Sequence, residues 1–156
     1  MKRSTNRILT THTGSLIRPT ELLSLADAAE QGDGNRQAYG ACLRAAVTEV
    51  VRRQAETGID VVSDGEFGKS SWAAYVLERI TGFTEQSGRL KPLLWLGSDR
   101  ERFRDFFAEE MPSAITGSPA EVCTGPITYV GQAAIQRDID NFTAALASAR
   151  VEEAFL

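Results

Sequence analysis

Helical and strand-like segments alternate along these 156 residues, which predicts an α/β protein with a parallel sheet. The clearest strand is residues 59–63, a short apolar run with β-branched side chains. It follows a long amphipathic pattern over residues 36–57, and Gly58 between the two supplies a left-handed helix cap. The strand leads into Asp64 and Glu66. Polar residues at the carboxyl end of a buried parallel strand are where α/β proteins place their chemistry.

The other elements are predicted from apolar spacing and capping residues. The remaining helices cover residues 20–31, 71–79, 99–110 and 132–148. Two further strands are expected over residues 93–96 and 121–124, each followed by a glycine, and residues 81–91 are expected to be irregular. No polar or glycine-rich linker divides the sequence, so we expect residues 1–156 to form a single domain.

Composition excludes several classes of protein. The net charge of -4 argues against a nucleic-acid partner, because neutralising phosphates requires a basic face. No apolar run approaches the roughly 18 residues of a membrane span, and no signal peptide follows the basic N-terminus. Cys42 and Cys123 lie far apart, inside a predicted helix and a predicted strand, so they suggest neither a secreted disulfide framework nor a zinc site. We therefore expect a cytoplasmic protein.

Residues 10–19 form the first cluster of chemically useful side chains. The backbone N–H groups of Gly14 and Ser15, just before a helix, can bind a carboxylate or another anion, with Arg18 adding positive charge. His12, the only histidine, can serve there as a base or a ligand. The alternative is a plain loop whose hydroxyls cap the helix and whose histidine is structural.

Asp64 and Glu66, separated by one glycine, form the second cluster. Two carboxylates at a strand end can hold a substrate ammonium group, coordinate a cation, or act as an acid and base pair. The alternative is that Asp64 caps the following turn while Glu66 is solvated. Lys69 and Trp72 can line a pocket nearby, although Trp72 is expected in the core.

Three motifs in order, residues 11–19, 58–67 and 124–128, resemble the cobalamin-independent methionine synthase family, and more closely its short single-domain relatives. The resemblance implies a (β/α)8 TIM barrel in which zinc activates a thiol, homocysteine in the synthases, for methyl transfer from a methyl-folate. It also implies that Gly14, Ser15 and Glu66 hold the amino-acid end of the thiol substrate. His12, Arg18 and Asp64 are further candidates for substrate binding.

Two departures from the family pattern shape this expectation. The family's zinc ligands, a His-x-Cys pair, a glutamate and a later cysteine, have no counterpart here, and a complete barrel needs about 250 residues. We therefore expect an incomplete N-terminal portion of the barrel that supplies the thiol-binding half, binds no metal alone and is inactive alone. Arg18 and Asp64 are typical of the short relatives, so the thiol need not be homocysteine.

Alternatives remain for the function. Within the same superfamily they are a thiol alkyltransferase of the epoxide–coenzyme M transferase type and a decarboxylase of the uroporphyrinogen type. The alternative of a different kind is a non-catalytic fragment, or one subunit of a split barrel that a second chain completes. Such a fragment would expose strand edges and apolar surface.

Overall fold

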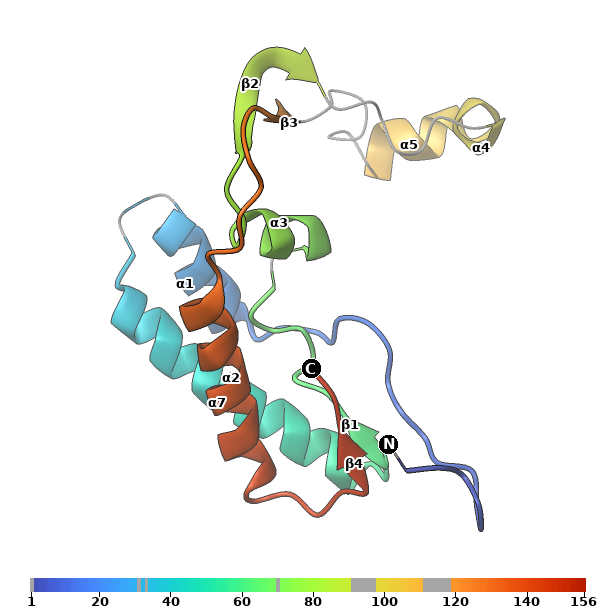
Figure 1. Cartoon of the computed structure of the whole chain (residues 1–156). Coiled ribbons are helices and arrows are strands. Elements are labelled where there is room, and N and C mark those ends of the chain that lie inside the picture. The colour runs from blue at the N-terminus through green and yellow to red at the C-terminus, as the bar shows by residue number, and fades with distance from the viewer. Residues whose placement is uncertain (1, 31, 33, 70, 91–97, 111–118) are drawn as a thin grey trace. The chain divides into compact units, whose positions relative to one another are not determined.

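The computed structural model describes residues 2–30, 32, 34–69, 71–90, 98–110 and 119–156 (Figure 1). Their contacts divide the chain into two compact units, and each is treated by itself. Unit 1 comprises Met1–Tyr75 and Gly131–Leu156, and unit 2 comprises Val76–Val130. The mixed α/β class is confirmed, but the described residues do not form a complete barrel. The expectation of a single domain stays a prediction.

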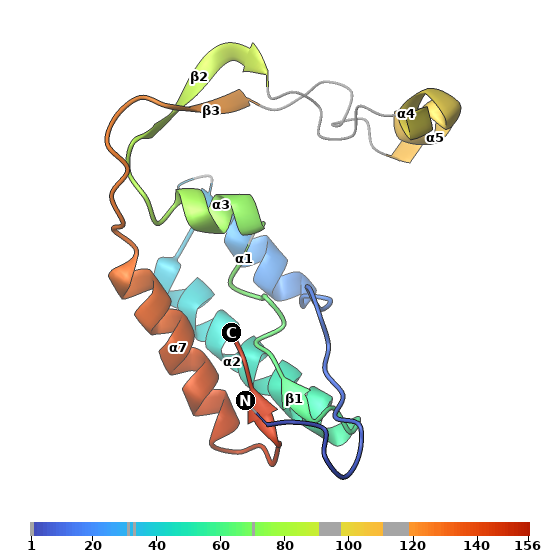
Figure 2. The same cartoon turned by 45° about the vertical axis from the view of Figure 1, so that its right-hand side comes forward.

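Three helices of unit 1 pack together: α1 (Thr20–Glu30), α2 (Arg36–Glu56) and α7 (Gln132–Leu146). The long α2 lies beside α7 and also contacts α1 (Figures 1 and 2). Asn35 begins α2, because its side chain accepts hydrogen bonds from the next backbone N–H groups. Gly58 ends it with φ 86°, so the predicted left-handed cap is confirmed.

The sheet of unit 1 is parallel. β1 (Val61–Val62) pairs with β4 (Glu153–Ala154), and Thr11 forms a parallel bridge to Val61 on the other side. Within unit 1, the Thr11 segment, β1 and β4 are therefore neighbours in the sheet in their order along the chain, an order that also occurs in barrels. The strand predicted over residues 59–63 is confirmed in a shorter form.

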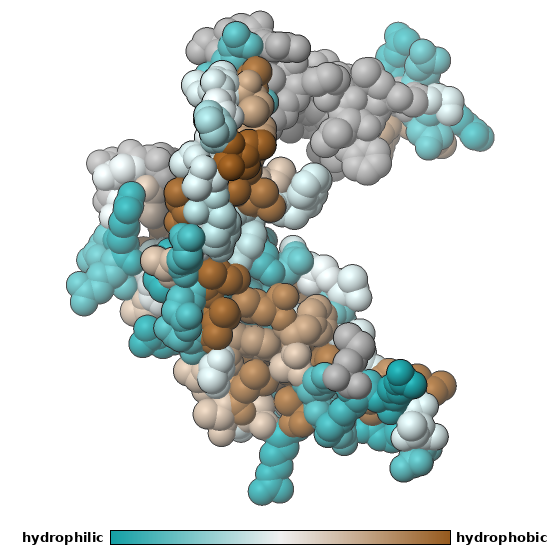
Figure 3. All heavy atoms as spheres, viewed as in Figure 1, coloured by the Kyte–Doolittle hydropathy of each residue, from teal (hydrophilic) through white to brown (hydrophobic). Residues whose placement is uncertain are grey.

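The core of unit 1 lies between the helices and the sheet. It consists of Leu22, Leu43, Ala46, Val47, Val50, Val51, Val62, Phe67, Phe142 and Ala145. The stripe of α2 was predicted from the spacing of Tyr39, Leu43, Ala46, Val47 and Val50; the last four are buried, and Tyr39 is partly buried and packs against the core. Figure 3 shows hydrophobic side chains on the surface around α7 as well, and Ile139 in that helix is 42% exposed.

Unit 2 contains an antiparallel pair of strands, β2 (Phe83–Leu90) and β3 (Pro119–Cys123). The strand predicted over residues 121–124 is therefore confirmed, but the irregular structure predicted over residues 81–91 is wrong. Phe83 pairs with Cys123, 40 positions along the chain, and local sequence patterns do not reveal such a long-range partner. The strand predicted over residues 93–96 lies outside the described residues.

Two of the helices predicted between residues 71 and 110 need correction. The helix predicted over residues 99–110 is divided into α4 (Ser98–Arg102) and α5 (Arg104–Glu110). The helix expected over residues 71–79 is the shorter α3 (Trp72–Leu77), and its Trp72 is 80% exposed. The expectation of Trp72 in the core is therefore wrong for the described residues.

In the part of the chain that the structure describes, no helix is both long and apolar enough to span a membrane.

Candidate functional site

The strand register brings the two predicted clusters together. Thr11 pairs with Val61, 50 positions later in the sequence. The Leu16 N–H donates to the Gly65 carbonyl at 3.0 Å, and these two residues have nearly the same separation in the sequence. Gly14 and Ser15 follow the bridge residue Thr11 within a few positions, and Asp64 and Glu66 follow the carboxyl end of β1 in the same way. The loop that contains Gly14 and the turn that contains Glu66 therefore lie side by side.

Ser15 and Glu66 are in direct contact. The Ser15 hydroxyl donates to Glu66 Oε2 at 2.6 Å, and the two residues are 51 positions apart in the sequence. Ser15 is exposed and Glu66 is half-buried, so the pair is accessible at the edge of the core. The alternative had Glu66 solvated, and its half-buried side chain also makes this contact with Ser15.

The backbone of this turn is left-handed. Gly65 has φ 67° and Glu66 has φ 58°, and Glu66 is the only described residue other than glycine with a positive φ. A Cβ at position 65 would lie 3.1 Å from a ring carbon of the buried Phe67. The left-handed conformation of Glu66 is costly for a residue that has a side chain, and such conformations are often found at functional sites. Gly14 is also left-handed, with φ 90°.

Asp64 has the capping role that was one of its two predicted alternatives. Its Oδ1 atom accepts a hydrogen bond from the Glu66 N–H at 2.9 Å, and its side chain is 8% exposed. The ammonium group of Lys69 lies 4.0 Å from the same oxygen and 5.4 Å from the centre of the Tyr75 ring. Asp64 therefore shapes the turn from within, and its carboxylate is balanced by a nearby cation.

Arg18 reaches the same turn from the first cluster. Its guanidinium donates to the Glu66 carbonyl at 2.8 Å and also to the Lys69 carbonyl. The positive charge that Arg18 was predicted to add thus lies beside backbone carbonyl oxygens.

Gln54 supports the site from behind and was missed by sequence reasoning. This α2 side chain is 5% exposed. Its amide accepts from the Ser63 N–H at 3.1 Å and donates to the Ser63 carbonyl at 2.7 Å. It therefore fixes the end of the strand just before Asp64. The signal available in the sequence was a glutamine on the buried stripe of α2, four residues after Val50.

His12 is half-buried, and no hydrogen bond among the described residues joins its side chain to Ser15 or Glu66. Its Nε2 atom is buried and lacks a hydrogen-bond partner in that part of the chain. The role predicted for His12 in substrate binding stays a prediction.

No three histidine, cysteine, aspartate or glutamate side chains of the described residues lie close enough together to hold a metal ion. Cys42 is half-buried on α2, and burial raises the pKa of its thiol, whereas Cys123 is exposed on β3 in unit 2. The residues described here therefore do not fit the family's zinc site.

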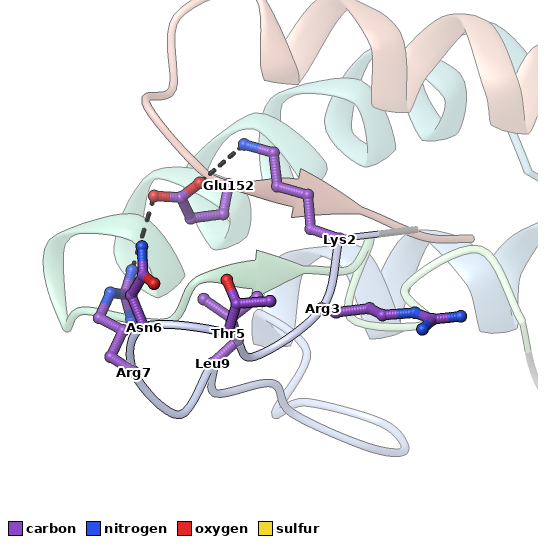
Figure 4. A pocket seen from close by; sticks show the side chains of 7 residues that line it. All are labelled: Lys2, Arg3, Thr5, Asn6, Arg7, Leu9 and Glu152. Atoms are coloured by element: carbon purple, nitrogen blue, oxygen red, sulfur yellow. Dashed lines mark hydrogen bonds and ion pairs between the residues drawn. The ribbon is translucent and has the colours of Figure 1, made fainter.

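A surface depression lies at the opposite end of β1. It is lined by Lys2, Arg3, Thr5, Asn6, Arg7, Leu9 and Glu152 (Figure 4). Arg7 donates to both carboxylate oxygens of Asp60, at 2.7 and 2.5 Å, and Lys2 forms an ion pair of 2.7 Å with Glu152. Since Lys2 and Arg7 already have acidic partners at the amino end of the strand, their ion pairs serve the structure there, separately from the Ser15–Glu66 contact.

Comparison with known proteins gives the family. Residues 8–154 match the family model described as the catalytic domain of cobalamin-independent synthase. The chain belongs to this family of cobalamin-independent methionine synthases, as its three motifs indicated.

Individual relatives are distant. The chain is 24% identical over 141 residues to a 5-methyltetrahydropteroyltriglutamate–homocysteine methyltransferase of Thermotoga petrophila, which covers 83% of this chain and 19% of that protein. A protein of the same name from Chelativorans is 26% identical over 146 residues, 86% of this chain and 19% of its own length. A Bacillus subtilis protein named only as uncharacterized YxjH is 32% identical over 71 residues, 46% of this chain and 19% of its length. The chain thus spans about a fifth of the length of the two methyltransferases.

Proposed function

We propose that this chain binds the amino-acid end of a thiol substrate for a methyltransferase of the methionine synthase type. In the complete enzyme, the thiolate sulfur would form a bond to the methyl group as that group leaves the nitrogen of a methyl-folate, and the nitrogen would take up a proton. The observation that carries the proposal is the 2.6 Å contact between Ser15 and Glu66. It joins two motifs that the family resemblance links to the same substrate.

The chemistry of the contact suits an α-amino acid. A carboxylate that accepts one hydrogen bond retains other lone pairs, and a substrate ammonium group can use them in a charge-assisted hydrogen bond. In the adjoining loop, no hydrogen bond of the described residues uses the backbone N–H of Gly14 or Ser15. These N–H groups are suitable donors for a carboxylate of the same substrate.

The acidic side chain also bears on the alternative thiols. Coenzyme M carries a sulfonate and no amine, so a carboxylate at its binding site would repel it. Glu66 therefore favours an amino-acid thiol over that alternative. The zinc expected for the complete enzyme has no fitting set of ligands among the described residues, and none of them is proposed as a zinc ligand.

The proposal is tested by binding of homocysteine to the 156-residue chain, followed by amide chemical shifts. We expect shifts confined to the Gly14–Ser15 loop and the turn around Glu66. We expect Glu66→Gln to weaken binding about 10- to 100-fold, since a hydrogen bond to a charged group contributes about 1.5–3 kcal/mol. Glu56→Gln, at the exposed end of α2, is the matched control and should bind as the natural chain does. Shifts located elsewhere would contradict the proposal.

A further inference from the structure

The hydrogen bonds of Arg18 go to the backbone of the turn that carries Glu66. One guanidinium nitrogen donates to the Glu66 carbonyl at 2.8 Å and also to the Lys69 carbonyl. The Lys69 N–H donates to the Glu66 carbonyl at 3.1 Å, which closes the turn. The guanidinium therefore bonds to the first and the last carbonyl of one turn. Its fixed, planar array of donors suits such a role better than an ammonium group does.

This turn requires support from outside itself. Glu66 has φ 58°, a left-handed conformation that residues with a side chain rarely adopt. Such conformations persist where surrounding contacts determine them. Just before the turn, Asp64 accepts a hydrogen bond from the Glu66 N–H at 2.9 Å. From the facing loop, the Leu16 N–H donates to the Gly65 carbonyl, and Arg18 holds the carbonyl of Glu66 itself.

We propose that Arg18 is a positioning residue, which fixes this turn so that the Glu66 carboxylate faces Ser15 and which does not contact the substrate. The expected effect of Arg18 on substrate binding rests on the proposed function, in which Glu66 holds the substrate ammonium group. The effect of Arg18 on the conformation of the turn does not depend on it. This positioning role replaces the expectation that Arg18 adds charge for an anionic part of the substrate. The half-buried guanidinium is instead directed at the backbone from 48 and 51 positions away.

The first experiment needs no ligand. In the 156-residue chain, backbone carbon chemical shifts report the left-handed conformation of Glu66. We expect Arg18→Gln to remove this signature while the amide shifts of α2 and α7 stay unchanged. We expect Arg18→Lys to retain part of it, and Arg3→Gln, a matched loss of charge at the opposite end of β1, to retain all of it. An unchanged Glu66 signature in both Arg18 variants would overturn the inference.

The second experiment compares homocysteine with 3-aminopropane-1-thiol, which keeps the amine and lacks the carboxylate. If Arg18 acts by positioning Glu66, Arg18→Gln weakens both ligands by the same factor, about tenfold, and Arg18→Lys restores part of the affinity. A loss confined to homocysteine would show that Arg18 contacts the carboxylate and would overturn the inference. If the natural chain binds neither thiol, the proposed function fails, and the ligand-free shifts still decide the role of Arg18.

Discussion

The Ser15 hydroxyl donates a 2.6 Å hydrogen bond to the Glu66 carboxylate across 51 positions of sequence. The parallel bridge between Thr11 and Val61 makes this contact possible, because the chain continues from both residues toward adjoining segments. Arg18 and Leu16 add backbone contacts between the same two segments. A loop and a turn thus form one structural unit at the carboxyl end of the sheet.

The buried amide of Gln54 should be necessary for the end of the strand. In Gln54→Met the side chain keeps a similar length, but the Ser63 N–H and carbonyl lose their side-chain partner. Leaving buried polar groups unsatisfied costs about 1–3 kcal/mol, and we expect that decrease in the free energy of unfolding in urea. Gln37→Met at an exposed position of the same helix should change it by less than about 0.5 kcal/mol. Equal effects of the two substitutions would contradict this role.

The left-handed backbone of Glu66 predicts a reversal of the usual order of alanine and glycine. Glu66→Ala and Glu66→Gly both remove the carboxylate and its bond to Ser15, so only the backbone preference differs. At φ 58° the glycine variant should be the more stable by about 1 kcal/mol, since left-handed backbone costs an L-residue roughly 1–2 kcal/mol. Thermal or urea unfolding of the two variants provides the comparison. Greater stability of the alanine variant would show that the turn is not left-handed in solution.

The ion pair at the amino end of the sheet predicts a pH dependence. The Arg7 guanidinium, and next the Thr10 N–H, hold the pKa of the Asp60 carboxyl well below its usual range. A carboxyl whose pKa is lower in the folded chain stabilises the fold above its unfolded pKa, about 3.9, and that contribution is lost as the pH falls through the folded value. The stability difference between the natural chain and Arg7→Gln should be constant from about pH 5 to 7.

Below about pH 4 the same difference should shrink. Arg3→Gln, a neighbouring change without an ion pair to Asp60, is the control and should show no such trend. Urea midpoints measured across this range, at low and high salt, supply the test. A difference that grows as the pH falls would contradict the assigned ion pair, and added salt should reduce the effect because Arg7 is exposed.

Local sequence signals predicted the helical part of unit 1 well. The buried stripe of α2 and the end of that helix at Gly58 depend on spacing and on a glycine cap, and both are properties of adjacent residues. Long-range pairing was beyond such signals. β2 was predicted as irregular because its partner β3 is separated from it by a long segment of the sequence.

The same distinction applies to the candidate site. Residue types at these positions identified Ser15 and Glu66 separately, but their contact depends on the bridge between Thr11 and Val61, which lie 50 positions apart. Arg18 was predicted to add positive charge to the first cluster, and its hydrogen bonds to the carbonyls of the turn depend on the tertiary fold. Gln54 was not predicted as a site residue, because nothing in the sequence of α2 indicates that its amide bonds to the backbone of Ser63.

The central claim, that Glu66 holds the ammonium group of an amino-acid thiol, is tested most directly by a cycle of two proteins and two ligands. The dissociation constants of homocysteine and of 4-sulfanylbutanoate, which lacks only the amine, are measured with the natural chain and with Glu66→Gln by titration calorimetry. We predict that the substitution weakens homocysteine about 10- to 100-fold and leaves 4-sulfanylbutanoate unchanged or bound slightly more tightly. Equal changes for the two ligands would contradict the claim.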